Sequence, residues 1–565
     1  MSDWMKTTLH ERGLEIRCLM VAGLLAGLAV AFGGRDLLAA PPPKVEDFST
    51  GISDRVVGQI NTFIARGWED NEVTPSPIAD DAEWLRRVYL DIVGHIPPAK
   101  TVEAFLENTE PDKRAKLIDE LLASPDYVHN FTEVWTNILI GRNTPRRTSR
   151  VGMKKFLREA FARNRPWNDV VYDLVTAEGH FEENGAVNFL LSQLQGNERS
   201  EEYHVEATAN LTRIFLGQQV QCTQCHNHPF NEWKQNQFWE INSFLRQTRR
   251  QDVQKYNPQT GQMDDDYSVL AYRNFSGPVY FENRAGVMQV AYPTFQGVEI
   301  DRNAEDRRQE LGRLMCYDDP THQVARAFVN RMWGHFMGYG FTRPVDDMGP
   351  HNPESHPEVV DLLTKEFVES KYDVKQLIRW ICNTTSYNLT SQFNPKNQFD
   401  NPAAGEVPLF SRMYVKTMQA EQLYDSLLVA TNADRAGGAG FEAAENQRER
   451  WMADFLRLFG GNETDEPTLF SGTIPQALLM MNGPLVQKAI SGEQGSYIHS
   501  VLTNPRLRND AARIEALYLA SLGRPPSRSE SSQLLKLMKA QRDPVKAYQD
   551  LYWALLNSNE FIVNH

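Results

Sequence analysis

Residues 82–94 read AEWLRRVYLDIVG, and the spacing of their apolar side chains decides the fold. Apolar residues recur at i, i+1, i+4, i+5 and i+8, which places them on one face of an α-helix. These residues are Trp84, Leu85, Val88, Tyr89 and Ile92. Gly94 can end this helix, and Pro97 and Pro98 can begin the next one. The stretch therefore predicts a helix that packs one face against a core and is followed directly by a second helix.

The same helical period recurs further along the chain. Residues 111–125, PDKRAKLIDELLASP, carry an apolar stripe between two prolines. Residues 322–340, HQVARAFVNRMWGHFMGYG, predict a helix with one apolar arc and a glycine at its end. The arc consists of Phe328, Val329, Met332, Trp333 and Phe336. Ser355 and Glu358 have the spacing of a capping box, which predicts another helix start.

One helical unit occurs twice. YLDIVGHIPP at 89–98 is similar to YLASLGRPP at 518–526, and LLASPDYVHN at 121–130 is similar to LLNSNEFIVN at 555–564. Two copies do not make a solenoid, which needs at least three stacked repeats. We therefore interpret the far end of the chain as a partial repeat of 84–130, a packing unit that brings the two ends of the chain together.

The middle of the chain has a different pattern. Around residues 251–300 the helical period disappears, and short runs rich in Val, Tyr and Phe alternate with Gly and Pro, which is typical of short strands. The predicted fold is mainly α, a multi-helical two-domain architecture with a small β insertion. The predicted segments are a signal peptide or anchor at 1–40, a linker at 41–75, a helical domain at 76–250, the β-rich insertion at 251–300 and a second helical domain at 301–565.

Length and composition indicate an ordinary globular protein. The chain has 565 residues, of which 41% are hydrophobic and 23% are charged. Its formal net charge is −14, whereas nucleic-acid-binding proteins usually present a basic face, so no nucleic-acid partner is expected.

The N-terminus predicts export. Arg12 and Arg17 precede an apolar run at 18–32, which is shorter than the roughly 20 residues of a membrane span and fits the core of a secretory signal. The run LLAA at 37–40 offers two small residues, Ala39 and Ala40, before a Pro-rich segment as a cleavage site, although Leu38 is not ideal for cleavage. The alternative is an uncleaved anchor, which would be the protein's one membrane attachment. Either way we expect the body of the protein in the periplasm or cell envelope.

The chain carries a Cys-x-x-Cys-His motif in QCTQCHNHPFNEW at 221–233. Covalent haem c needs two thiols spaced to meet two vinyl groups, followed by a histidine as the proximal iron ligand, and Cys222, Cys225 and His226 supply this set. A random chain of this composition would contain the pattern about once in a thousand times.

Two alternatives stay open for the motif. A zinc site could use the two thiols with His226 and His228, although four ligands within seven residues would be cramped. The two cysteines could instead close a disulfide. Of the other three cysteines, Cys18 belongs to the signal, and Cys316 and Cys382 either pair with each other or stay buried as free thiols.

The sequence does not identify a sixth iron ligand. His228 is too close to reach the opposite face of the same iron, and His204 and His335 are the other candidates. Aromatic residues follow the motif and could line a haem or form ordinary core: Phe230, Trp233, Phe238, Trp239 and Phe244. The chain shows no phosphate-binding glycine loop, nucleophile elbow or His-Glu-x-x-His motif that would indicate an enzyme class.

The chain resembles the planctomycete cytochrome C-like domain of unknown function, followed by the planctomycete-specific domain of unknown function. The stretches that carry the first resemblance are 84–91, 121–127 and CTQCHNHPFNEW at 222–233. Those that carry the second are FVNRMWGHFMGYGFTRPVDDMG at 328–349, SHPEVVDLL at 355–363, TTSYNLTS at 384–391 and QALLMMNGPLV at 476–486. The resemblance implies a cytochrome label that rests on the same Cys-x-x-Cys-His run, and it attaches no activity to either domain.

The sequence thus predicts an exported c-type haem protein with an electron-transfer or redox role and an unidentified redox partner or envelope component. The alternative is a non-haem envelope scaffold or binding protein, in which the motif holds a metal such as zinc or closes a disulfide.

Overall fold

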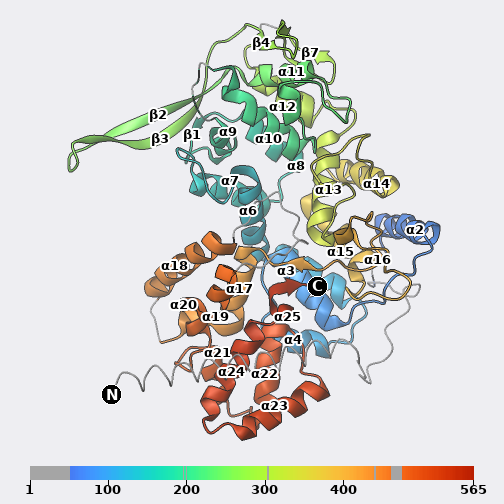
Figure 1. The fold of residues 1–565 in the computed structure, drawn as a ribbon, viewed down its shortest axis with the longest axis vertical. Coiled ribbons are helices and arrows are strands. Elements are labelled where there is room, and N and C mark those ends of the chain that lie inside the picture. The colour runs from blue at the N-terminus through green and yellow to red at the C-terminus, as the bar shows by residue number, and fades with distance from the viewer. Residues whose placement is uncertain are drawn as a thin grey trace.

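The computed structural model describes residues 51–565, apart from residues 52, 195, 197, 199, 302–303, 438–440 and 460–473. The signal peptide or anchor predicted at 1–40, and residues 41–50 of the predicted linker, lie outside the described residues. Helices dominate and the strands lie in the middle of the chain, which confirms the mainly α fold with a small β insertion (Figure 1). Within the described part, no helix has both the length and the apolar character needed to cross a membrane.

Helix α2 (Arg55–Asp70) lies inside the segment predicted as a linker at 41–75. Asp54 begins it, because its carboxylate accepts hydrogen bonds from the backbone N–H groups of Val56 at 2.7 Å and Val57 at 3.2 Å. Its buried face consists of Val56, Val57, Ile60, Ile64 and Trp68. The linker prediction is wrong over these residues. The prolines before them are typical of a linker, but the spacing of their apolar side chains is that of a helix.

Helix α3 (Asp81–Val93) contains the stretch that predicts the fold. The Asp80 carboxylate begins the helix by accepting a hydrogen bond from the Glu83 N–H at 2.9 Å. Gly94 ends it with φ 81°, a left-handed conformation that favours glycine. The predicted apolar face is confirmed, because Trp84, Leu85, Val88 and Ile92 are buried and Tyr89 is half-buried.

Further helices continue the N-terminal half. They are α4 (Ala99–Glu107), α5 (Lys113–Ala123), α6 (Pro125–Ile140), α7 (Arg150–Ala162), α8 (Trp167–Thr176), α9 (Asn188–Gln193), α10 (Val205–Phe215) and α11 (Gln235–Leu245). Short 3-10 turns lie among them: η2 (Gly185–Val187), η3 (Glu201–His204) and η4 (Gln221–Gln224).

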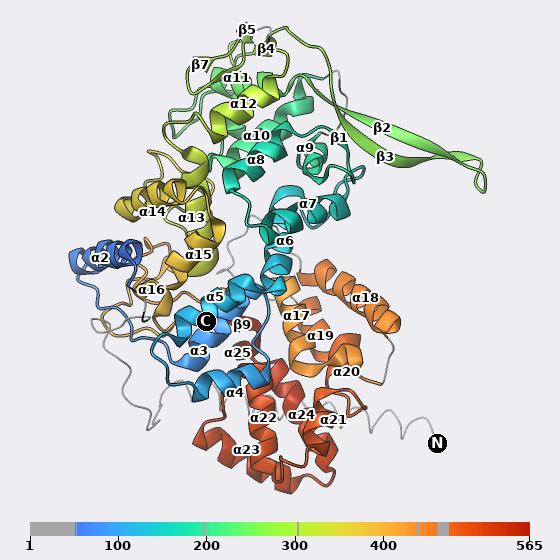
Figure 2. The same cartoon turned by 180° about the vertical axis from the view of Figure 1, so that it is seen from behind.

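The β insertion is built from short antiparallel pairs. The strands are β1 (Gly179–His180), β2 (Thr248–Asn257), β3 (Gln262–Tyr272), β4 (Val279–Glu282), β5 (Met288–Ala291), β6 (Thr294–Phe295) and β7 (Val298–Glu299). One sheet has the order β1-β3-β2, and the β2–β3 hairpin projects from the body as a long arm (Figures 1 and 2). The β4–β5 hairpin packs on α11, where Val279, Phe281 and Ala291 join Phe238 and Trp239 in a small apolar cluster.

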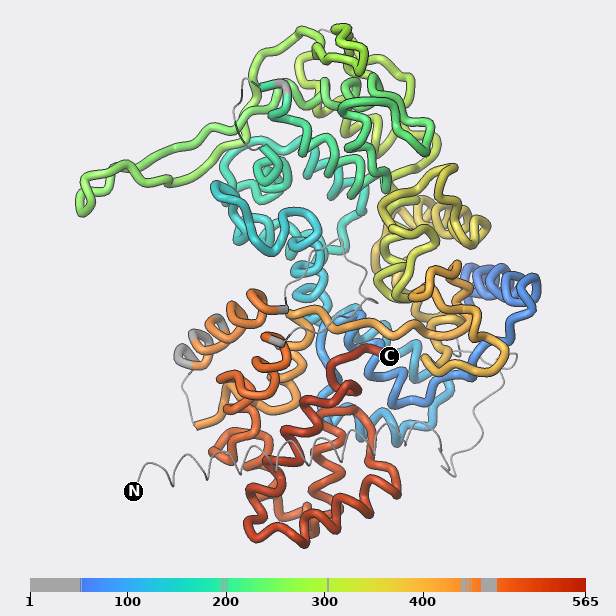
Figure 3. Tube along the Cα trace, in the orientation of Figure 1, coloured from blue at the N-terminus to red at the C-terminus, as the bar shows by residue number. Residues whose placement is uncertain are grey.

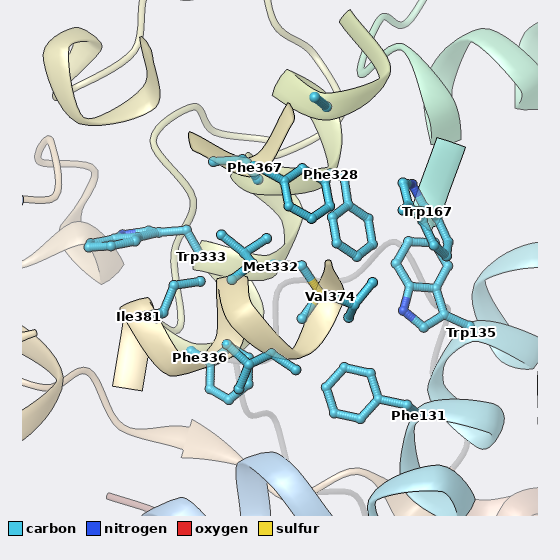
Figure 4. Close-up of a cluster of buried hydrophobic side chains, with 14 of the residues drawn as sticks. Phe131, Trp135, Trp167, Phe328, Met332, Trp333, Phe336, Phe367, Val374 and Ile381 are labelled. Carbon is cyan, nitrogen blue, oxygen red and sulfur yellow. The ribbon is translucent and has the colours of Figure 1, made fainter. Parts of the chain in front are cut away.

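The second half returns to helices. They are α12 (Arg307–Cys316), α13 (Gln323–Met337), α14 (Pro357–Glu369), α15 (Val374–Cys382) and α16 (Thr385–Asn388), followed by the 3-10 turn η5 (Pro402–Ala404). The apolar arc predicted on α13 is buried, and Figure 4 shows its Phe328, Met332, Trp333 and Phe336 packed among aromatic residues of other helices, including Trp135.

The capping box predicted at Ser355 and Glu358 is not formed. Helix α14 begins at Pro357, its N-cap is His356, and no side chain caps it. The Ser355 N–H instead donates a hydrogen bond to the Phe341 carbonyl oxygen at 2.8 Å. Contact with the loop after α13 therefore overrides the local capping pattern.

A separate core lies in the C-terminal part. Its elements are β8 (Lys416–Thr417), α17 (Ala420–Thr431), η6 (Ala433–Arg435), α18 (Phe441–Phe459), α19 (Ile474–Asn482), α20 (Pro484–Ala489), α21 (Tyr497–Thr503), α22 (Asp510–Leu522), α23 (Arg528–Ala540), α24 (Pro544–Leu556), α25 (Asn559–Ile562) and β9 (Val563–Asn564). Leu90 and Ile96 belong to this core, although they come from the N-terminal half.

The two cores do not follow the predicted domain boundary at residue 301. The larger core includes buried side chains from both 56–245 and 311–414, so the first helical domain and the start of the second form one packed unit. The smaller core contains residues from 418–561. Figure 3 shows this lower unit, from α17 onward, as the orange and red part of the trace. The change of core near 417 follows the segment between α16 and α17, which contains the 3-10 turn η5 and the strand β8 but no α-helix and is rich in Asn and Pro.

The two copies of the predicted repeat lie side by side and share local features. Gly94 ends α3 and Gly523 ends α22, both in the left-handed conformation. Arg86 on α3 connects the copies, because its guanidinium donates to the Ser521 carbonyl at 3.1 Å and to the Phe561 carbonyl at 2.6 Å. The C-terminus consequently lies beside α3, as Figures 1 and 2 show.

Candidate functional site

The Cys-x-x-Cys-His run forms an exposed turn between α10 and α11. Cys222 and Thr223 lie in η4, and Thr223 points inward, where its N–H and hydroxyl both donate to the Val220 carbonyl, at 2.8 and 2.6 Å. Because the central threonine is buried, Cys222 and Cys225 are turned outward, and both are exposed free thiols. The turn therefore presents two accessible sulfur atoms.

His226 has the proton arrangement of a metal ligand. Its Nδ1 lies 2.7 Å from the Asn227 carbonyl oxygen, so Nδ1 carries the proton and donates it to that oxygen. The lone pair is then on Nε2, which has no hydrogen-bond partner among the described residues. Histidines that bind metals commonly donate their other N–H to a carbonyl in this way.

His228 has a different role. The Nδ1 of its ring accepts hydrogen bonds from the backbone N–H groups of Phe230 at 3.2 Å and Asn231 at 3.1 Å. The backbone N–H of His228 donates to the Trp233 carbonyl at 2.8 Å. The bonds to the ring place the proton on Nε2 and use the lone pair of Nδ1. Burial and the nearby His351 lower the pKa of His228, which favours this neutral ring. In this conformation, His228 holds the loop closed instead of offering a lone pair.

The aromatic residues after the motif support the turn from beneath. Trp239 donates from Nε1 to the Gln224 carbonyl at 3.1 Å, and Gln235 donates from Nε2 to the same carbonyl at 3.1 Å. Phe238 and Trp239 are buried in the cluster under β4–β5, and Phe244 is buried in the larger core. Phe230 is 82% exposed. These side chains therefore act as core, with Phe230 as the exposed exception.

Two family models match the chain in succession. Residues 59–250 match PSCyt2, described as a protein of unknown function (DUF1549), and residues 307–454 match PSD1, also described as a protein of unknown function (DUF1553). The chain combines a PSCyt2 domain with a PSD1 domain. No curated protein and no solved structure matches it.

The PSD1 domain contacts the PSCyt2 turn through the loop after α13. The Met348 N–H donates to the Gly217 carbonyl at 2.7 Å, and Gln219 donates from Nε2 to Asp346 Oδ1 at 2.8 Å. This loop brings His351 to the site, with its ring centroid 5.9 Å from that of His228. The turn is thus built from both domains.

His351 is the site residue that sequence reasoning missed. Its Nε2 lies 3.0 Å from Asp347 Oδ1, and its Nδ1 is buried without a hydrogen-bond partner among the described residues. A histidine oriented by a carboxylate, with its second nitrogen free, has the chemistry of a metal ligand. No local pattern marks this residue, because it comes more than a hundred positions after the motif and meets it through folding alone.

The two histidines predicted as candidates for the sixth iron ligand make hydrogen bonds to backbone carbonyls outside the turn. His204 is fully buried with Nε2 2.8 Å from the Thr248 carbonyl, and burial lowers its pKa to about 3. His335 is half-buried with Nε2 3.1 Å from the Asp91 carbonyl, and desolvation lowers its pKa as well. Neither ring makes a hydrogen bond or ring contact with the turn among the described residues.

The remaining cysteines are structural. Cys316 and Cys382 are buried free thiols, and burial raises the pKa of each, so both stay protonated. Across the described ranges, no group of three or more His, Cys, Asp or Glu side chains is placed to hold a metal ion. In the turn, Cys222, Cys225 and His226 have the composition and order of a haem c attachment site.

Proposed function

We propose that Cys222, Cys225 and His226 attach haem c covalently, and that the protein is an exported c-type haem protein with an electron-transfer or redox role in the cell envelope. The observation that carries the proposal is the pair of exposed free thiols next to a histidine whose Nδ1 faces a backbone carbonyl at 2.7 Å.

The three residues have separate roles. Cys222 and Cys225 would hold the haem through thioether bonds, formed by adding each thiol across one vinyl group, and this addition would need no oxidant. The Asn227 carbonyl orients the His226 ring by accepting its Nδ1–H, so Nε2 would be the nitrogen that binds the iron. A bound haem supplies reversible one-electron chemistry.

Location and partner follow from the rest of the chain. The charged and apolar pattern of residues 1–40 supports export, and covalent haem attachment takes place outside the cytoplasm. An exposed turn suits electron exchange with a redox partner or another envelope component. The net charge of −14 does not suit a nucleic-acid partner.

The alternative function is a non-haem envelope scaffold or binding protein. There the same two thiols and His226 would hold zinc, or the thiols would close a disulfide. Its support is the accessibility of both sulfur atoms.

The experiment is mass spectrometry of the tryptic peptide at residues 214–234, from protein exported by a host that matures c-type cytochromes. The expected product is this peptide carrying one haem through both cysteines. Variants Cys222→Ala and Cys225→Ala should each lose the doubly attached product, and Cys316→Ala, a buried thiol far along the chain, should keep it. A folded protein whose peptide carries no haem contradicts the proposal. Zinc in the sample, or a peptide lighter by two hydrogens, would then identify the metal or disulfide alternative.

A further inference from the structure

The two short strands β8 and β9 place a lysine opposite an asparagine. They pair antiparallel, with Lys416 directly across from Asn564 and Thr417 across from Val563. Residues directly opposite in an antiparallel pair point to the same face of the sheet, with their Cβ atoms about 5 Å apart. The amine of Lys416 and the amide of Asn564 are therefore held on one side of this pair.

Asp91 of α3 joins these two side chains. Its Oδ1 accepts a hydrogen bond from Lys416 Nζ at 2.6 Å and another from Asn564 Nδ2 at 2.7 Å. Its Oδ2 accepts a hydrogen bond from the Tyr387 hydroxyl at 2.8 Å. One carboxylate oxygen thus contacts both the amine and the amide nitrogen, and the tyrosine fixes the orientation of the carboxylate.

The group is enclosed. Lys416 is 4% exposed, Asn564 3% and Asp91 2%. Tyr387, which donates to Asp91, and Phe336, whose carbonyl accepts from Lys416, are fully buried. Water is therefore excluded from the amine and from the amide carbon.

The Asn564 amide is incompletely satisfied. Its Oδ1 is buried and has no hydrogen-bond partner among the described residues. Buried carbonyl oxygens are rarely left in this state, so the group needs an explanation. With the amide turned over, so that its Oδ1 takes the place of the Nδ2 now beside Asp91, a protonated Asp91 would provide the missing donor and would polarise the amide carbon.

We propose that Lys416 and Asn564 join in an intramolecular isopeptide bond, with Asp91 as the proton carrier. The Lys416 ammonium transfers a proton to Asp91, and the free Nζ attacks the Asn564 Cγ. A new Nζ–Cγ bond forms, the Cγ–Nδ2 bond breaks, and the departing nitrogen takes up two protons, the one that Asp91 carried and a second one released from Nζ. The products are the amide cross-link and one ammonium ion, so neither an oxidant nor a co-reactant is needed.

The surroundings favour each step. Burial lowers the pKa of Lys416, which favours the uncharged amine that can attack. The competing state is a plain buried ion pair, because Lys416 Nζ also donates to the carbonyls of His335 at 2.9 Å and Phe336 at 2.8 Å. In that state the ammonium has three acceptors and no reaction occurs.

The cross-link would join the C-terminal strand to the start of the smaller core. Residues 417–563, which include α17 to α25, would then lie in a closed loop. Closing a loop in the unfolded chain removes conformations from it and stabilises the folded state.

The test is peptide mapping of the purified full-length protein by trypsin and tandem mass spectrometry. Trypsin releases residues 547–565 as the C-terminal peptide, and modification of Lys416 blocks cleavage after it, which leaves 413–435 intact. We expect a branched species that joins these two peptides and is lighter than their sum by one ammonia. Separate peptides 413–416 and 547–565 from a folded sample would overturn the proposal and identify an ion pair only.

Variants locate the bond. Lys416→Arg and Asn564→Ala should each abolish the branched species, whereas Lys488→Arg, which changes a surface lysine paired with Glu493, should retain it. If the buried variants do not fold, the wild-type map alone decides, because a free C-terminal peptide contradicts the bond without reference to any variant.

Discussion

Two histidines in the Cys-x-x-Cys-His loop look equivalent in the sequence but have opposite roles in the fold. Among the described residues, His226 makes one side-chain hydrogen bond, to the carbonyl of its neighbour, and its Nε2 has no partner. The His228 ring accepts two backbone N–H groups at Nδ1. A single loop thus contains one histidine with an unused nitrogen and one that closes the loop.

This difference predicts effects of different size on stability for two alanine variants. His228→Ala leaves the N–H groups of Phe230 and Asn231 without their acceptor, and should lower the free energy of unfolding by about 1–2 kcal/mol. His226→Ala removes one partly exposed contact and should change it by less than about 0.5 kcal/mol. Amide hydrogen exchange measures this directly, since Phe230 and Asn231 should lose protection in the first variant only. Equal protection in both variants would show that His228 does not hold the loop.

The sequence could predict the donor residues but not their surroundings. Cys222, Cys225 and His226 are contiguous, so their spacing alone indicates their chemistry. The tautomer of His226 depends on where the Asn227 carbonyl oxygen lies. His351 reaches the site only because the PSD1 loop contacts Gly217 and Gln219. Such contacts have no local signal.

At the scale of elements, the duplicated helical unit is the feature that the sequence described best. The glycine that follows each first helix has positive φ, 81° at Gly94 and 70° at Gly523. Ser124 and Ser558 cap the corresponding later helices, through bonds to the N–H groups of Tyr127 and Phe561. A glycine at the end of a helix and a serine at the start of one can be recognised from residue type alone, so the sequence could indicate both copies of this unit.

The two glycines supply a matched prediction. Alanine at either position should lower the free energy of unfolding by about 1–2 kcal/mol, because the left-handed conformation is unfavourable for a residue with a Cβ. At Gly94 a Cβ would also lie 2.5 Å from Asn130 Oδ1, whereas at Gly523 its nearest neighbours are 4.0 Å away. Gly94→Ala should therefore destabilise the protein by at least about 1 kcal/mol more than Gly523→Ala, because overpacking adds roughly that much. Denaturant unfolding of both variants compares them, and equal losses would mean that Asn130 moves aside freely.

Elements defined by long-range contacts were harder to predict. Helix α2 lies in the segment predicted as a linker, because the prolines before it are typical of a linker although its apolar residues have a helical period. The capping box at Ser355 failed because the serine N–H bonds to Phe341, a contact made by the tertiary fold.

At the scale of the whole molecule, one apolar core unites the PSCyt2 domain with the first part of the PSD1 domain. Buried residues from 56–245 and 311–414 pack together, and the exposed Cys-x-x-Cys-His turn lies at the surface of this unit. The separate C-terminal core is joined to it through the paired repeats and Arg86. The proposed function would therefore depend on an exposed turn that is held by this shared core.

The most direct measurement is a visible spectrum with a pyridine haemochrome assay, on the wild-type protein exported by a host that matures c-type cytochromes. The account predicts a Soret band and the haemochrome of a haem held by two thioether bonds, retained after acid–acetone extraction of non-covalent haem. A folded sample with no Soret band, or one whose haem is fully extracted, would contradict the account.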